Sequence, residues 1–258
     1  MSLIQCKYQS NVLRMSTDIT LILPRFNPAR KPHPKFRTLY LLHGFTGDSF
    51  DWIRFSNIER FAEEYQTAVV MPCAYNSVYT DMAFGQDYFT YLSTEMADFV
   101  AAAFPLSEKR EERYVAGCSM GGYGAVKWAL ARPDFFSAAV SFSGSLHAED
   151  RIKGLSPHAG NQCEGIYGKP PVVDPKTQDV FAMLKTMAEK GETIPRLFLC
   201  CGLEDKSYLQ KATADFLELA ASLGIETTFA GGHGGHTFAY WESLFPQVFE
   251  WLTGEKKG

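Results

Sequence analysis

Residues 114–125 read Tyr-Val-Ala-Gly-Cys-Ser-Met-Gly-Gly-Tyr-Gly-Ala, and they are the most informative segment of the chain. An apolar run passes directly into small residues, and Gly117, Ser119 and Gly121 form the pattern G-x-S-x-G at the junction. The pattern is typical of a nucleophile elbow, a sharp turn from a strand into a helix. Such a turn strains the backbone of the serine, and glycine on either side lets the strand and the helix approach closely. We therefore expect the Ser119 hydroxyl at the carboxyl edge of a sheet, over a helix N-terminus.

On both sides of the elbow, short apolar runs alternate with segments of helical periodicity. The expected strands are 38–42, 68–71, 136–142, 196–201 and 226–229, and the expected helices are 57–65, 87–104, 179–190, 208–223 and a last one through Trp251. Two alternating segments, 3–13 and 18–23, precede them and predict an antiparallel hairpin. The order predicts an α/β-hydrolase fold, with a mostly parallel central sheet, a leading hairpin and helices on both faces.

The domain organisation follows from the length of the chain and from its alternation of expected strands and helices. The 258 residues, 46% hydrophobic, fit one α/β domain over residues 1–258. Over about residues 144–175 the alternation of strand and helix patterns stops, and the segment contains Gly, Pro, His and scattered charged residues. An irregular insertion of this length usually forms a cap or a binding loop.

Composition excludes several classes of function. The net charge of −4, without a basic stripe, argues against a nucleic-acid partner. Residues 1–10 contain no continuous apolar run that would form a signal peptide, and no segment has the ~18 apolar residues of a membrane span, so we expect a cytoplasmic protein without a membrane partner. The six cysteines lack ligand spacing, so we expect buried reduced thiols and no metal.

A serine nucleophile requires a general base and an acid that orients it. In this architecture they follow in the order serine, acid, histidine, each on a loop after a strand. The loop after 196–201 offers Glu204 and Asp205, and the loop after 226–229 offers His233 and His236. We favour Asp205, which lies farther along its loop, and His236, which directly precedes the last helix. The simpler alternative is that both residues only cap helices.

An acyl-transfer site also needs donors for the oxyanion. The backbone N–H groups of Met120, after the serine, and of Phe45, after the strand that ends at His43-Gly44, are the expected donors. We expect His43 to hold this loop and Cys118 to be a packing residue rather than the nucleophile. Aromatic residues near the site could wall a small acyl pocket, although such side chains are often simply core: Trp52, Tyr79, Phe238 and Trp241.

Taken together, the motifs resemble the esterase D and tributyrin esterase group of α/β hydrolases, which includes S-formylglutathione hydrolases and feruloyl or acetyl-xylan esterases. The resemblance spans nearly the whole chain and is carried by 41–44, Asp51-Trp52, Met71-Pro72, Tyr79-Thr80-Asp81, 116–125, the Asp205 loop and 236–241. It implies a triad of Ser119, Asp205 and His236, with activity on short acyl esters. It also implies that the chain could form homo-oligomers.

The resulting hypothesis is a serine carboxylesterase that acts on a small-molecule acyl ester or thioester and uses no cofactor. Within enzymes, the alternatives are an S-formylglutathione thioester hydrolase and a feruloyl or acetyl-xylan esterase. A hydrolase-fold binding protein without catalysis is the alternative from another class. The sequence departs from the group at Cys118, at Val78 and in the Gly-rich loop before His236, which are positions that could alter the acyl pocket.

Overall fold

The computed structural model describes residues 1–25, 35–155 and 162–256. Eight described strands form one sheet in the order β1-β2-β4-β3-β5-β6-β7-β8. Their bounds are β1 Ser2–Ser10, β2 Met15–Leu23, β3 Arg37–Leu42, β4 Thr67–Pro72, β5 Arg113–Cys118, β6 Ala138–Phe142, β7 Arg196–Cys200 and β8 Thr227–Ala230. β1 and β2 pair antiparallel, β2 is antiparallel to β4, and all remaining pairs are parallel. The predicted fold class is confirmed.

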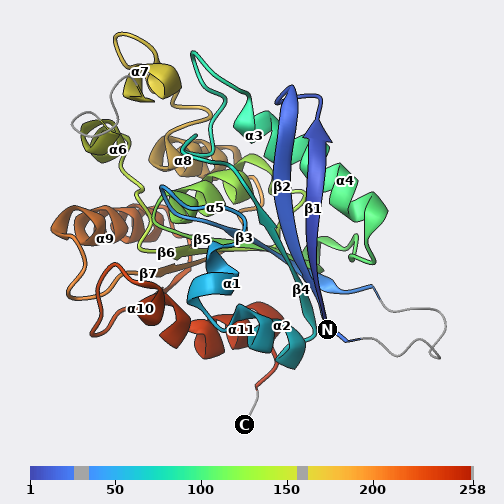
Figure 1. The fold of residues 1–258 in the computed structure, drawn as a ribbon. Coiled ribbons are helices and arrows are strands. Elements are labelled where there is room, and N and C mark those ends of the chain that lie inside the picture. Colours follow the sequence, from blue (N-terminus) through green and yellow to red (C-terminus); the bar gives the residue numbers. More distant parts are fainter. Residues whose placement is uncertain (26–34, 156–161, 257–258) are drawn as a thin grey trace.

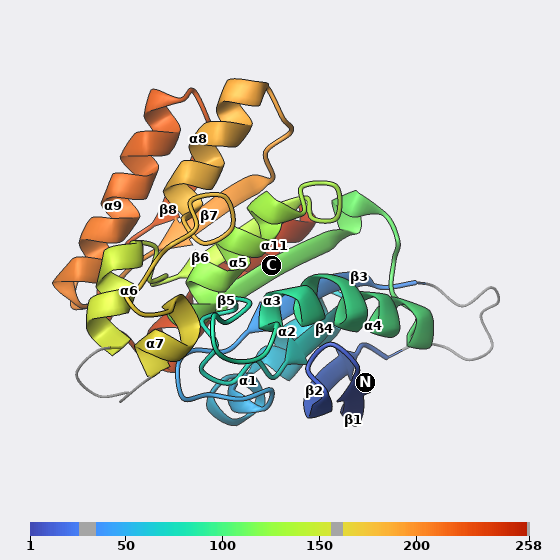
Figure 2. The same cartoon turned by 90° about the horizontal axis from the view of Figure 1, so that it is seen from above.

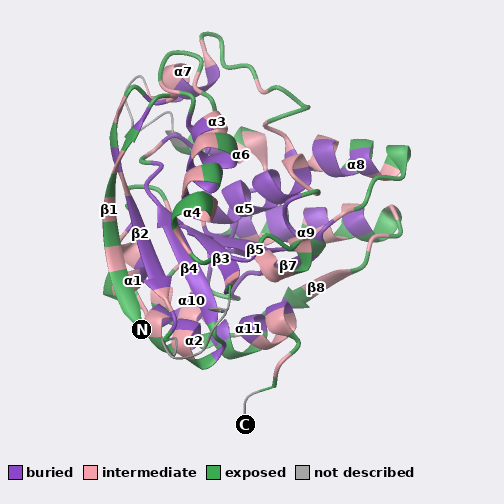
Figure 3. Ribbon diagram, turned by 90° about the vertical axis from the view of Figure 1, so that its right-hand side faces the viewer, coloured by how far each residue is buried: buried purple, intermediate pink, exposed green. Residues whose placement is uncertain are grey.

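Helices cover both faces of the sheet (Figures 1 and 2). One face carries α3 Tyr88–Thr90, α4 Ala97–Ala103, α5 Met120–Ala131, α8 Val180–Lys190 and α9 Ser207–Ser222. The other face carries α1 Asp51–Phe55, α2 Ile58–Glu64, α10 Phe238–Ser243 and α11 Phe245–Thr253. The strands point alternate side chains into these two layers: Tyr40 and Leu42 enter the first core, and Leu39 and Leu41 enter the second. The central strands are therefore buried on both faces (Figure 3).

Local sequence explains where the helices begin and end. Asp179 caps α8 by accepting hydrogen bonds from the N–H groups of Phe181 and Ala182, and Gly191 ends it with a left-handed φ of 64°. The helix expected over 87–104 is instead built from α3, a π-helical segment at Tyr91–Met96, and α4. Sequence reasoning also missed α1, which is only five residues long.

The segment 144–175 differs from the irregular insertion that we expected. Its described part contains two short helices, α6 Ala148–Leu155 and α7 Gln162–Tyr167, and residues 156–161 lie outside the described structure. α6 lies near α9, and α7 lies beyond it at one end of the molecule (Figures 1 and 2). No helix among the described residues is long and apolar enough to cross a membrane.

Candidate active site

The elbow serine lies between β5 and α5 with an unusual backbone. Its φ of 55° and ψ of −114° are outside the ordinary helical and extended regions. The Ser119 N–H donates to the Phe142 carbonyl at 2.8 Å, and its carbonyl accepts from the Ser145 N–H at 3.1 Å. Strain of this kind costs ~1–3 kcal/mol and persists only where neighbouring structure enforces it. Here Phe142, the last residue of β6, and Ser145, just after that strand, supply two of the restraining hydrogen bonds.

Glycine is required on both sides of Ser119 by close packing. A Cβ atom on Gly117 would lie 2.4 Å from the Gly121 carbonyl oxygen, and one on Gly121 would lie 2.5 Å from the Leu42 carbonyl oxygen. These contacts are with backbone atoms, which cannot move aside as a flexible side chain can. The two outer glycines of G-x-S-x-G thus let β5 and α5 meet at the turn.

The candidate acid Asp205 and the candidate base His236 lie on loops after β7 and β8, at the carboxyl edge of the sheet where β5 also ends. His236 Nδ1 lies 3.1 Å from Asp205 Oδ1 and 3.3 Å from Oδ2. The Asp205 side chain is fully buried, and that of His236 is 21% exposed. A buried carboxylate against Nδ1 fixes the imidazole tautomer and leaves Nε2 for proton transfer.

The Asp205 carboxyl has a pKa below its ordinary value. Burial acts to raise that pKa, but hydrogen bonds with His236 and Ser143 and one from the Lys206 N–H together outweigh it. The Lys206 N–H donates to Oδ1 at 2.7 Å. Asp205 is therefore ionised at neutral pH and able to stabilise an imidazolium.

The two residues that competed for these roles form a pair of their own. His233 Nδ1 lies 2.9 Å from Glu204 Oε1, and the two side chains are 90% and 55% exposed. The Gly234 N–H also donates to Glu204. Because the Glu204–His233 pair is open to solvent while the Asp205–His236 pair is shielded, the geometry favours the latter for catalysis.

A cavity of about 190 Å³ lies beside the elbow serine. Its lining brings Ser119 together with both expected oxyanion donors, Phe45 and Met120. The other lining residues are Val78, Ser145, Asp150, Arg151, Gly154, Lys206 and Tyr208. Helix α6 supplies three of these, Asp150, Arg151 and Gly154, so the cavity lies between the elbow and α6. A candidate nucleophile beside candidate backbone donors and a small, partly open cavity is an arrangement that acyl transfer could use.

Comparison with known proteins decides the family. The model of the Esterase family, described as "Putative esterase", matches residues 10–252. The chain belongs to this esterase family. An acetyl esterase of Caldicellulosiruptor saccharolyticus is 28% identical over 265 residues, covering 98% of each chain. Among solved structures, the fluorophosphonate-binding serine hydrolase FphF of Staphylococcus aureus superposes with a TM-score of 0.90 at 32% identity, covering 98% of this chain and 99% of that chain.

A second solved structure from Staphylococcus aureus, the S-formylglutathione hydrolase FrmB, has a TM-score of 0.88, 32% identity and 98% coverage of both chains. Together with the family match, these similarities make this esterase a serine hydrolase that acts on carboxylic esters. They agree with the resemblance drawn from the motifs.

Two residues near Ser119, His43 and Cys118, are buried and uncharged. The His43 ring is fully buried: its Nε2 accepts from the Ala74 N–H at 3.0 Å, so Nδ1 carries the proton and donates to the Gly44 carbonyl at 2.7 Å. Burial lowers the pKa of His43 to about 4, so the ring is neutral at physiological pH. Cys118 is also buried, and burial raises the pKa of its thiol. A buried neutral thiol is a poor nucleophile.

The four aromatic residues proposed for the acyl pocket lie elsewhere. Trp52, Tyr79 and Trp241 are each no more than 3% exposed, and in the described structure the cavity beside Ser119 is lined by other residues. The Trp52 indole packs edge-on against Phe238 and donates to the Leu42 carbonyl. The Tyr79 hydroxyl donates to the His43 carbonyl. These side chains support the loops of the esterase from the core.

Trp241 contacts His236 directly and reaches Asp205 through Ser143. Its ring meets that of His236 edge to face, with centroids 5.0 Å apart, and its indole N–H donates to Ser143 Oγ at 3.0 Å. Ser143 in turn hydrogen-bonds to Asp205 and has a left-handed φ of 50°. Sequence reasoning missed Ser143, whose only signal is its place directly after β6 at the carboxyl edge of the sheet.

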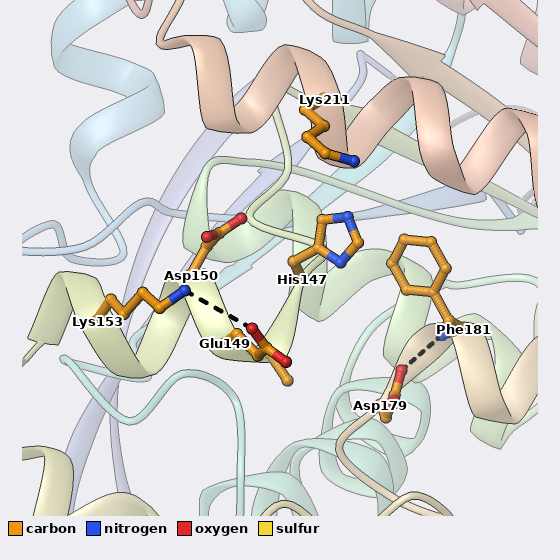
Figure 4. Close-up of a pocket in the computed structure, with 8 residues that line it drawn as sticks. His147, Glu149, Asp150, Lys153, Asp179, Phe181 and Lys211 are labelled. Carbon is orange, nitrogen blue, oxygen red and sulfur yellow. Dashed lines mark hydrogen bonds and ion pairs between the residues drawn. The ribbon is translucent and has the colours of Figure 1, made fainter.

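A second and larger cavity, of about 570 Å³, lies on another side of α6 (Figure 4). It is lined by His147, Ala148, Glu149, Asp150, Lys153, Asp179, Phe181 and Lys211. The His147 ring stacks on Phe181, and its Nε2 lies 2.8 Å from Asp215 Oδ2. Over the described residues, no group of three or more His, Cys, Asp or Glu side chains is placed to hold a metal ion.

Proposed function

We propose that this esterase hydrolyses short-chain acyl esters through an acyl-enzyme, with Ser119, Asp205 and His236 as its triad. The observation that carries the proposal is the shielded Asp205–His236 pair at the sheet edge where the strained elbow presents Ser119. The order along the chain is the one this fold requires.

In the proposed mechanism, Ser119 Oγ attacks the ester carbonyl carbon while His236 Nε2 takes the hydroxyl proton. Asp205 stabilises the imidazolium. The backbone N–H groups of Phe45 and Met120 hold the oxyanion, a contribution of about 3 kcal/mol per donor. The C–O bond then breaks, and His236 returns its proton to the departing alcohol. Water attacks the acyl-enzyme by the same route in reverse and releases the carboxylic acid.

The size of the cavity supports a small acyl group. Its volume of about 190 Å³ is below the ~300–1,000 Å³ of pockets that enclose drug-sized ligands. Thioester hydrolysis is the second candidate, because FrmB resembles this chain as closely in identity as FphF does. The cytoplasmic location and self-association rest on the sequence alone and stay predictions.

A substrate panel tests this proposal. We expect the highest kcat/KM among 4-nitrophenyl acetate and butyrate, a lower value for the octanoate, and loss of activity in Ser119→Ala. S-formylglutathione and methyl ferulate, measured beside them, separate the thioester and aryl-ester alternatives. A folded wild-type protein that hydrolyses none of these and does not react with a fluorophosphonate probe would instead support the non-catalytic alternative.

A further inference from the structure

Helix α6, the proposed cap, buries a charged residue where it meets the rest of the protein. Among residues 148–154, whose side chains the structure describes, only Arg151 is buried, at 5% exposure. The helix nevertheless forms part of the wall of the Ser119 cavity, through Asp150, Arg151 and Gly154. Figure 4 shows Glu149, Asp150 and Lys153 on the same helix at the second cavity. Ile152 is partly buried against the core, and cavities lie on two sides of the helix.

The Arg151 guanidinium makes four hydrogen bonds and one ring contact, and through them it joins four separate segments. Nη1 donates to the carbonyls of Ser145 and Leu146, each at 2.8 Å, which lie between β6 and α6. Nη2 donates to the Gln178 carbonyl, before α8, at 2.8 Å. Nε donates to the Tyr167 hydroxyl of α7 at 3.1 Å. The guanidinium also lies 3.6 Å from the centroid of the Tyr123 ring on α5.

These contacts place the cap relative to the nucleophile. The Tyr123 N–H donates to the Ser119 carbonyl, and the Ser145 N–H donates to the same oxygen. Arg151 therefore connects α6 and α7 to two residues that hold the elbow backbone. Each of its hydrogen-bond partners in the described structure is a neutral oxygen, so the fixed fork of donors serves geometry rather than charge pairing.

We propose that Arg151 is a positioning residue that clamps the cap and thereby sets the length of acyl group that the Ser119 cavity accepts. The proposal rests on the proposed esterase function. Removing the clamp frees α6 to move outward and enlarges the cavity toward the second one, with which it shares Asp150. The kcat/KM for esters with longer acyl groups then rises relative to that for acetate, while the reaction at Ser119 still takes place.

The test compares acyl-chain profiles of Arg151→Met, Arg151→Lys and the wild type on 4-nitrophenyl acetate, butyrate and octanoate. In Arg151→Met we expect the octanoate-to-acetate ratio of kcat/KM to rise about tenfold, mainly through a lower KM for octanoate. Lysine keeps the charge but cannot reach carbonyls on several segments, so Arg151→Lys should resemble the methionine variant. Wild-type selectivity in Arg151→Lys would contradict the clamp and indicate a role for charge alone.

Two further variants keep the test decisive. Tyr167→Phe removes only the partner of Nε and should raise the same ratio by a smaller factor, so it replaces Arg151→Met if that variant does not fold. Lys153→Met removes a cation from the exposed face of the same helix and should leave the ratio unchanged. An unchanged ratio in folded Arg151→Met or Tyr167→Phe, with fluorophosphonate labelling intact, would overturn the clamp alone. A wild type without labelling or hydrolysis would overturn the proposed function instead.

Discussion

Replacing Asp205 by asparagine tests the role of the shielded acid, and the chain supplies its own control. The Asp205–His236 pair is buried on the acid side, whereas the Glu204–His233 pair from the same two loops is exposed. Asparagine keeps the shape of the side chain but stabilises the wrong imidazole tautomer and cannot stabilise the imidazolium. In a Ser-His-Asp protease the equivalent change lowers kcat by about 10⁴, or about 5.4 kcal/mol.

We expect Asp205→Asn to lower kcat on 4-nitrophenyl acetate by about 10³ to 10⁴, because the imidazole loses both its tautomer and the charge that stabilises its cation. Glu204→Gln should change kcat by less than about threefold, because exposed ion pairs contribute only ~0–1 kcal/mol. Steady-state kinetics with both variants, corrected for the fraction folded by circular dichroism, measure this difference. A loss of less than tenfold in Asp205→Asn, or an equal loss in Glu204→Gln, would refute the assignment.

Three more predictions concern the elbow and its surroundings. Gly117→Ala should lower the free energy of unfolding by about 1–3 kcal/mol and reduce activity, because its Cβ would clash with the Gly121 carbonyl; thermal denaturation with near-normal stability would contradict this. Cys118→Ala should keep kcat within about threefold of wild type, because the buried thiol only packs. Loss of activity in this variant would make Cys118 a candidate nucleophile. Burial lowers the pKa of Lys127 to about 7, so above that pH the unfolded chain binds more protons than the folded one. The free energy of unfolding should therefore rise by about 2 kcal/mol from pH 7 to 9 in the wild type but not in Lys127→Met. Parallel urea titrations of the two proteins check this difference.

The fold was predictable because its signals are local. The elbow glycines, the strand-length apolar runs and the order of loops gave the sheet and the family. The sequence could also narrow the acid and base to two loops, because parallel strands bring their carboxyl ends to one edge. Within each loop the sequence favoured Asp205 and His236 by their positions, and the structure adds a physical difference, because Glu204 and His233 are the more exposed pair.

The acyl cavity could not be predicted for a different reason. Trp52, Tyr79 and Trp241 lie near the site in sequence, but hydrophobicity alone does not say which side of a loop an aromatic ring packs against. The lining comes partly from α6, in a segment without apolar periodicity. No motif in the sequence marks Arg151, and only the fold shows four segments converging on its guanidinium.

Trapping the acyl-enzyme is the sharpest test of whether Ser119 is the nucleophile. Wild-type protein and Ser119→Ala are quenched with acid during turnover of 4-nitrophenyl acetate, and intact mass spectrometry with peptide mapping locates any adduct. We expect the mass of one added acetyl group on the wild type, mapped to Ser119, and none on the variant. Acetylation of Ser119→Ala to the same extent, or an adduct mapped to Cys118 in the wild type, would contradict it.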